Sequence, residues 1–273
     1  MVLKAHKLGL GHVTWWSLPD QISLDRSQWA ARYPNFPLEP EPYADALKRA
    51  LFSIQPPKDG TRMKRLVRPL KAKDRWALVF EVPGEDNLRY HVEMAVELHD
   101  AYLAVVRYPT QYASLARDVE DAYQAERYRV TSNAVANMIL RHIRGECLAV
   151  VARKTGGVYF IPQMFEDRLE AVQALVEQLG GTMMAFRVDD DERGRKGLVT
   201  LIIEDLKGAV EAARANIEAR HKNDALLMAK QALDRVNFYR DGMMLATEHA
   251  EILKTELEQL IVDSALKNGE KND

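Results

Sequence analysis

The stretch CLAVVARKTGGVYFIP, residues 147–162, contains two apolar runs separated by Lys154-Thr155-Gly156-Gly157. Glycine adopts positive φ angles without steric cost, so the two adjacent glycines predict the turn of a β-hairpin. The preceding stretch, TSNAVANMILRHIRG at 131–145, spaces its apolar residues as a helix does. A helix followed directly by a two-stranded hairpin predicts a winged-helix-like domain, which we place at residues 111–196.

The first 110 residues predict a different domain. Residues 61–108 contain extended segments rich in Val, Leu and aromatic residues, separated by turn sequences such as PGEDN at 83–87. This pattern predicts an antiparallel β-meander, with Pro69 on an edge strand because proline cannot donate to a β-ladder. Two short helices are predicted before the meander, and an edge strand around residues 12–16.

The last third of the chain predicts long helices. Residues 197–267 are rich in Ala, Leu, Glu, Lys and Arg, lack proline, and carry apolar side chains at helical spacing. We expect a helical hairpin that folds back at Asp241-Gly242, or three helices if RHKND at 220–224 breaks the first. Residues 268–273 are expected to form a disordered tail. The predicted fold class is α+β.

Overall composition excludes some classes of partner. Lys and Arg number 38 and Asp and Glu 40, so the net charge of −2 gives no general attraction to nucleic acid or to anionic membranes. No run approaches the ~20 apolar residues of a membrane-spanning helix, and no signal peptide is recognisable. A single cysteine, Cys147, at the start of an apolar run is typical of a buried thiol in a reducing compartment. We expect a cytoplasmic protein with no membrane partner.

Basic residues gather around the predicted helix and hairpin. Between residues 127 and 155, six Lys or Arg side chains stand against one acid, Glu146. Clustered cations favour phosphate contact, because released counterions supply most non-specific affinity for nucleic acid. The candidate nucleic-acid-binding residues are Arg129, Asn133, Asn137, Arg141, Arg144, Arg153 and Lys154. A second basic run lies at residues 58–75. It is either a further phosphate-binding surface or a set of charges that keeps an edge strand from pairing with another chain.

Motifs for catalysis, metals and cofactors are weak. The sequence has no Walker, GxSxG or HExxH motif, and no histidine pair has the i, i+4 spacing of a helical zinc site. The adjacent carboxylates Asp189, Asp190 and Asp191 are more typical of a solvated loop than of a metal site. We therefore expect no enzyme activity, cofactor or metal. One alternative, an uncharacterised hydrolase, would use His91 and His99 with nearby carboxylates.

The order of helix, GGVYFIP hairpin (156–162), helix, strand and long helical hairpin resembles that of uncharacterised bacterial and phage-encoded proteins of unknown function. The resemblance covers roughly residues 130–266. It implies a bacterial or mobile-element source and no activity, and it carries over no functional residue.

These observations predict a non-enzymatic, oligomeric module of a bacterial or phage complex that contacts nucleic acid without sequence preference. The C-terminal helices would mediate assembly with a second copy or a protein partner. Leu227, Met228, Met243 and Met244 are adaptable apolar candidates for that contact. The alternative is an adaptor or structural assembly protein that binds only proteins.

Overall fold

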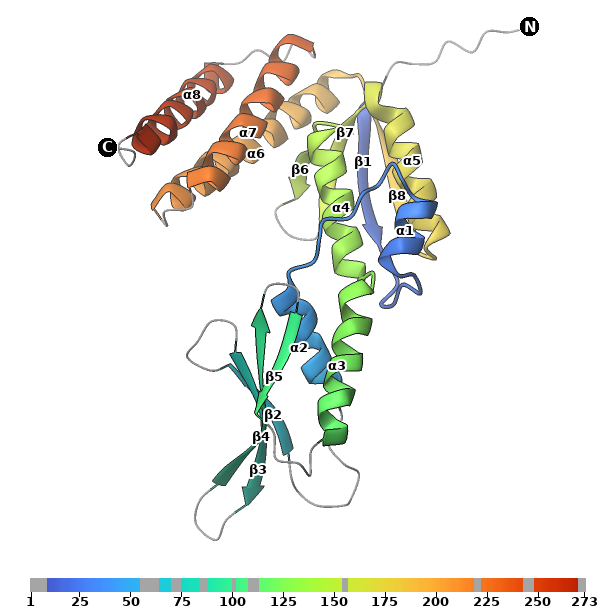
Figure 1. Cartoon of the computed structure of the whole chain (residues 1–273). Coiled ribbons are helices and arrows are strands. Elements are labelled where there is room, and N and C mark those ends of the chain that lie inside the picture. Colours follow the sequence, from blue (N-terminus) through green and yellow to red (C-terminus); the bar gives the residue numbers. More distant parts are fainter. Residues whose placement is uncertain are drawn as a thin grey trace, which may run out of the picture. The chain divides into compact units, whose positions relative to one another are not determined.

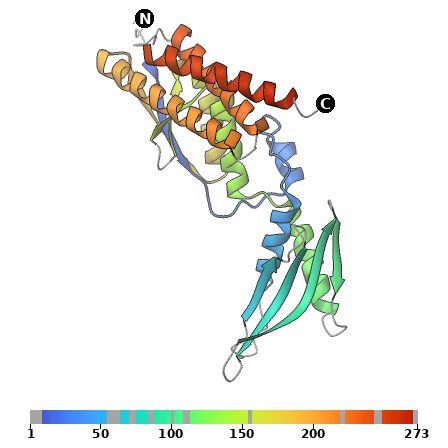
Figure 2. The ribbon, with the colours of Figure 1, turned by 90° about the vertical axis from the view of Figure 1, so that its left-hand side faces the viewer.

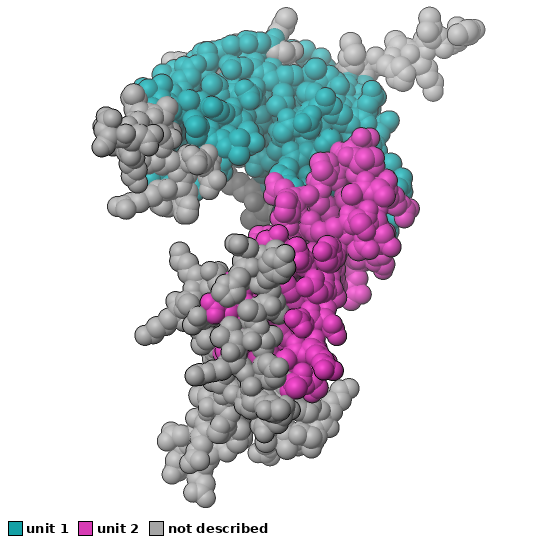
Figure 3. Space-filling view, in the orientation of Figure 1, with its two compact units in different colours: residues 1–20, 136–273 teal, residues 21–135 magenta. Residues whose placement is uncertain are grey.

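The protein divides into two compact units, residues 1–20 with 136–273, and residues 21–135 (Figure 3). The computed structural model describes residues 9–54, 64–69, 75–83, 88–99, 102–107, 113–153, 157–218, 222–242 and 248–269. Helices and antiparallel sheets occur in both units, which confirms the α+β class. This two-part division differs from the expected three parts because the first strand joins a sheet built mostly of residues after 149.

The unit formed by residues 21–135 contains the predicted meander. Its strands are β2 (Lys64–Pro69), β3 (Arg75–Pro83), β4 (Leu88–His99) and β5 (Tyr102–Arg107), paired antiparallel in chain order (Figure 2). Pro69 lies on the edge strand β2, as its missing N–H requires. Three helices accompany the sheet: α1 (Arg26–Arg32), α2 (Tyr43–Ser53) and α3 (Ala113–Tyr128).

Packing in this unit combines an apolar core with a charged network. Buried Leu47 and Leu51 of α2 form one cluster with Val119 and Tyr123 of α3 and with residues of β4. Beside it, the Arg49 guanidinium donates from Nε to Glu126 Oε2 over 2.9 Å and also pairs with Glu41, and Arg129 donates to Glu126 Oε1 over 2.9 Å. The partly buried Glu126 carboxylate thus ties α3 to Arg49 of α2.

The other unit is built on a second four-stranded sheet. Its strands are β1 (Gly9–Ser17), β6 (Val150–Arg153), β7 (Val158–Pro162) and β8 (Thr182–Asp189), in the order β6-β7-β1-β8 with every pair antiparallel. Helix α4 (Ser132–Gly145) precedes β6, and α5 (Glu166–Gln178) follows a short 3-10 turn after β7. The order β1-α4-β6-β7-α5-β8 is that of a ferredoxin-like fold, with the other unit inserted between β1 and α4.

The predicted hairpin exists but is not a two-stranded wing. β7 pairs on its far side with β1, so the expected edge strand around residues 12–16 is central in the sheet. Gly11 permits this close approach, because a Cβ atom at that position would lie 2.1 Å from the carbonyl oxygen of Ile161. The turn residues Lys154–Gly156 lie outside the described part of the chain.

Three helices, not two, follow the sheet. They are α6 (Glu192–Glu218), α7 (Lys222–Gly242) and α8 (Glu248–Gly269), which corresponds to the three-helix alternative with a break near 220–224 (Figure 1). The predicted tail overlaps α8 at 268–269, and residues 270–273 lie outside the described residues. Among the described helices, none is long and apolar enough to cross a membrane.

Helices α5 and α6 cover opposite faces of this sheet. The imidazole Nε2 of His12 lies 3.5 Å from the Glu166 carboxylate at the start of α5, whereas Val13 packs into the cluster that α6 and α7 share with the sheet. Successive side chains of a strand point to opposite faces, so the two helices lie on different sides of β1. Val150 and Phe160 join Leu206 and Val236 in the cluster on the α6 side.

Candidate functional site

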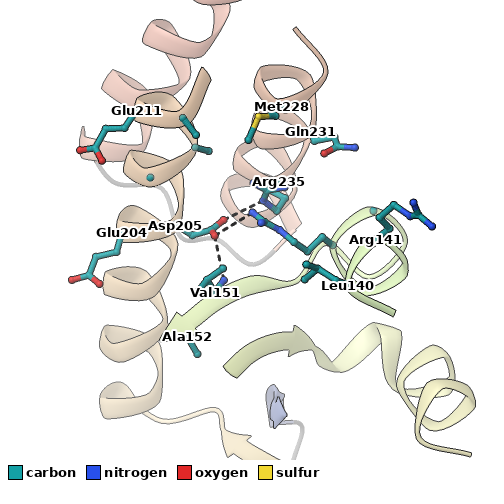
Figure 4. Close-up of a pocket in the computed structure, with 15 residues that line it drawn as sticks. Leu140, Arg141, Val151, Ala152, Glu204, Asp205, Glu211, Met228, Gln231 and Arg235 are labelled. Carbon is teal, nitrogen blue, oxygen red and sulfur yellow. Dashed lines mark hydrogen bonds and ion pairs between the residues drawn. The ribbon is translucent and has the colours of Figure 1, made fainter. Parts of the chain in front are cut away.

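A cavity of about 620 Å³ lies where α4, β6, α6 and α7 meet (Figure 4). Most of its wall is apolar. The apolar lining residues are Leu140, Val151, Ala152, Ala209, Ala212 and Met228. Gly208 of α6 also lines the cavity, and a Cβ atom added there would meet nothing within 4 Å. The site therefore combines apolar walls with open space beside α6.

Asp205 is the polar centre of the cavity. Its Oδ1 atom accepts hydrogen bonds from the backbone N–H of Val151 over 3.3 Å and from Nη2 of Arg144 over 3.4 Å. Its Oδ2 atom lies 3.3 Å from Nε of Arg235. One buried carboxylate thus connects α6 to α4, β6 and α7.

Burial distinguishes the two arginines. The Arg235 side chain is 3% exposed and that of Arg144 is 34% exposed. Burial lowers the pKa of Arg235 although Asp205 acts in the opposite direction. A guanidinium stays protonated in proteins, so both arginines carry charge at neutral pH. With Asp205 ionised, the two guanidinium groups and one carboxylate leave one positive charge in excess.

The other charged residues lie around the rim. Figure 4 shows Glu204 and Glu211 on the side of α6 facing away from Asp205, and both are exposed. Arg141, also exposed, extends from α4 away from the ion pair. All three residues nevertheless line the cavity, whose lining carries three arginines and three acidic residues in total.

Sequence reasoning missed Asp205 and Arg235. Each lies on the buried face of its helix, Asp205 beside Ile202 and Leu206, and Arg235 beside Ala232 and Val236. The signal that could have found them is one charge of each sign at positions where helical periodicity expects apolar residues. Charged residues are almost never fully buried unless paired, so that pattern predicts a buried ion pair.

The candidate nucleic-acid residues do not form one interface in the described structure. Asn137, Arg141 and Arg144 follow one face of α4, but the Arg144 guanidinium turns to Asp205. Arg153 is exposed at the end of β6, and Lys154 lies outside the described residues. Arg129, bonded to Glu126, and the exposed Asn133 belong to the unit of residues 21–135.

Other predicted candidates have structural roles or fall outside the description. The Asp191 carboxylate accepts a 2.6 Å bond from the N–H of Gly194 at the start of α6, and Asp190 pairs with Arg195. Asp191 thus caps α6, Asp190 pairs with a side chain in the first turn of that helix, and Asp189 is the last residue of β8. The side chains of His91 and His99, and those of the basic run at 58–75, lie outside the described residues.

Cys147 is a buried thiol, as the sequence predicts. It is 0% exposed, and burial raises its pKa to about 11, more than Arg168 lowers it. A thiol with so high a pKa is a weak nucleophile at neutral pH. Cys147 therefore belongs to the core.

Comparison with known proteins gives a family but no activity. No curated protein and no solved structure matches the chain significantly. A family model described as a family of unknown function, DUF6744, matches residues 9–266, which is nearly the whole chain. The expected resemblance to uncharacterised proteins, with no activity implied, is confirmed. By this match, the chain belongs to the DUF6744 family.

Proposed function

We propose that this protein is a non-enzymatic binding module that holds a small amphipathic molecule in the cavity between α4, β6, α6 and α7. The observation that carries the proposal is a 620 Å³ space with a mainly apolar wall and a cluster of polar groups centred on Asp205. Ligand pockets are typically about 300–1,000 Å³, mainly apolar, with a few placed polar groups that orient the ligand.

The lining favours binding over catalysis. The described residues that line the cavity include no histidine, cysteine, serine, threonine or tyrosine. Nucleophilic catalysis and much of general acid–base catalysis use such groups, and of the three carboxylates in the lining, Glu204 and Glu211 are exposed. The central carboxylate is already committed, since Oδ1 accepts two hydrogen bonds and Oδ2 faces Arg235. A fixed polar group suits recognition of a ligand.

A neutral fluorescent probe tests the cavity. N-phenyl-1-naphthylamine, whose fluorescence increases in apolar surroundings, is expected to bind the wild-type protein. Gly208→Leu is expected to weaken that binding at least about tenfold, because the new side chain occupies the space beside α6.

Gly197→Leu is the matched control for this experiment. Gly197 lies in the same helix, is exposed, and also has nothing within 4 Å of a built Cβ, but it does not line the cavity. Both substitutions remove a helical glycine, so both favour the helix by a similar amount. Equal probe binding by the two variants, or no binding by wild type, would contradict the proposal.

Nucleic-acid contact is the second candidate function. The exposed side chains of Asn137 and Arg141 on α4, and of Arg153 on β6, favour it. Labelled single-stranded and duplex DNA should bind with an affinity that falls steeply between about 50 and 200 mM salt. Arg153→Ala should weaken binding more than Arg187→Ala on β8, which is also exposed. Absence of binding at the lower salt concentration would remove this candidate.

Self-association is part of the proposed function. Leu227 on α7 is 58% exposed and Ile252 on α8 is 52% exposed. A contact with a second copy of the chain would remove both side chains from water. Light scattering is expected to give a mass above that of the monomer for wild type, and the monomer mass for the double variant Leu227→Asp, Ile252→Asp. A monomeric wild type at micromolar concentration would contradict self-association. Met243 and Met244 lie outside the described residues.

A further inference from the structure

The cluster of Arg144, Arg235 and Asp205 points to the chemical class of the ligand that the cavity binds. We infer, on the basis of the proposed binding function, that the cavity selects an organic anion: an apolar body carrying a carboxylate, phosphate or sulfonate group that Arg144 binds. The Arg144 and Arg235 guanidinium groups face a single carboxylate, Asp205. An anionic group on the ligand balances the positive charge of this cluster, while Arg141, Glu204 and Glu211 bring the lining as a whole to neutrality.

Asp205 cannot satisfy both arginines. Its Oδ1 atom is shared between the Val151 N–H and Arg144, and both bonds are long, at 3.3 and 3.4 Å. Nε of Arg235 is buried and has no hydrogen-bond partner in the described structure, although Oδ2 of Asp205 lies 3.3 Å away. Charge-assisted hydrogen bonds are ordinarily shorter, about 2.7–2.9 Å. Nε of Arg235 is therefore under-bonded for a buried group, and Arg144 contacts Asp205 only over a long bond.

Arg144 is the residue that can reach a ligand. Its side chain is 34% exposed and lines the cavity, whereas Arg235 is almost completely enclosed. A guanidinium carries five N–H donors in a planar fork, and the described bond to Asp205 uses one nitrogen. The rest of the fork can hold a carboxylate or phosphate in a bidentate arrangement. At the rim, Arg141 adds one positive charge, and Glu204 and Glu211 add two negative ones on the side of α6 that faces away from Asp205.

The walls of the cavity require an apolar body on the ligand. Leu140 lines the cavity from α4 and Met228 from α7 (Figure 4), and Ala209 and Ala212 of α6 are also part of the lining. Methionine adapts its shape to different apolar partners. A bare inorganic anion would leave these walls in contact with water, and a cationic amphiphile would place its charge against Arg144. An anionic amphiphile satisfies both parts of the site.

Two probes that differ in one charged group test the inference. The dye 1-anilinonaphthalene-8-sulfonate is N-phenyl-1-naphthylamine with an added sulfonate. Wild-type protein is expected to bind the sulfonate dye roughly tenfold more tightly than the neutral dye. Arg144→Gln is expected to reduce that ratio to about one, because the variant loses the group that distinguishes the two dyes. Arg144→Lys, which keeps the charge but loses the planar fork, should retain part of the preference.

Controls separate this inference from the proposed function. Arg214→Gln changes an exposed arginine on α6 that does not line the cavity, and it should leave the ratio unchanged. Gly208→Leu should weaken the binding of both dyes at least about tenfold. If both dyes bind equally, or the ratio survives Arg144→Gln, the inference is overturned and the cavity remains a binding site. If neither dye binds, the proposed function fails as well.

Competition then identifies the anionic group. Octanoate and octyl phosphate should displace the bound sulfonate dye, and octanol at the same concentration should displace it much less. The more effective of the two anions shows whether a carboxylate or a phosphate fits the Arg144 fork. Displacement by octanol as effective as that by both anions would overturn the inference.

Discussion

The Oδ2 atom of Asp205 on α6 lies 3.3 Å from Nε of Arg235 on α7, and both side chains are only 3% exposed. Removing two charges from water costs several kcal/mol each, and their attraction repays that cost only when the geometry is good. Here the pair is not aligned as a hydrogen bond. The pair therefore acts mainly to fix how α6 and α7 meet β6, where the Val151 N–H donates to the same carboxylate.

Asp205→Asn is predicted to destabilise the protein strongly. The substitution leaves the Arg235 guanidinium buried without its carboxylate, and breaking a buried pair in this way costs about 3–5 kcal/mol. Urea denaturation measures the loss in the free energy of unfolding. A double variant, Asp205→Leu with Arg235→Leu, should be more stable than Asp205→Asn, because apolar residues of similar volume often replace a buried pair without loss. An Asp205→Asn protein as stable as wild type would show that water reaches the pair.

Gly11→Ala is predicted to disrupt the pairing of β1 with β7. Gly11 has φ +155°, and an added Cβ atom would lie 2.1 Å from Ile161 O and 2.7 Å from Phe160 Cζ. Backbone atoms cannot yield as a flexible side chain does, so we expect a loss of about 2 kcal/mol or more. Gly197→Ala is the control and should stabilise α6 by up to about 1 kcal/mol. Thermal unfolding of both variants measures the difference, and a harmless Gly11→Ala would contradict the described register.

Local patterns were sufficient to predict the elements whose partners are near in sequence. The meander of β2 to β5 joins neighbouring strands, and Pro69 marks its edge. The pairing of β1 with β7 joins residues about 150 positions apart, as in Val13 with Phe160, and nothing in either strand identifies the other. The hairpin was therefore predicted correctly, but its place in a four-stranded sheet was not.

The candidate site shows the same limit. Arg141 and Arg144 were selected because basic residues cluster in that part of the chain. Charge counting along the sequence does not include a carboxylate 61 residues away, and Asp205 turns one of these arginines inward. The helical periodicity of α6 and α7 does indicate the Asp205–Arg235 pair. Each helix has one charged residue on its apolar face, and a buried charge requires a partner.

Glu126→Gln is predicted to destabilise the unit of residues 21–135 at neutral pH. Burial raises the pKa of Glu126, but hydrogen bonds from Arg49 and Arg129 outweigh burial and hold that pKa below its usual value of 4.5. Because the folded pKa is lowered, the carboxylate adds stability above pH 4.5 that is lost as the pH falls through the folded pKa. The variant should lose about 1 kcal/mol at pH 7. Urea denaturation at pH 7 and at pH 3.5 measures this, and a difference from wild type that does not shrink at the lower pH would contradict the described network.

Cys147 is predicted to resist alkylation in the folded protein. Burial raises the pKa of its thiol to about 11 from the usual value of 9.0, and the side chain is 0% exposed. The thiolate is the reactive form, so at pH 8 the shift alone lowers its population roughly 100-fold, and burial slows access further. Mass spectrometry after iodoacetamide treatment at pH 8 should find unmodified native protein and complete labelling in urea. Rapid labelling of the native protein would show that the segment joining α4 to β6 opens readily, since Cys147 lies between Gly145 and Val150.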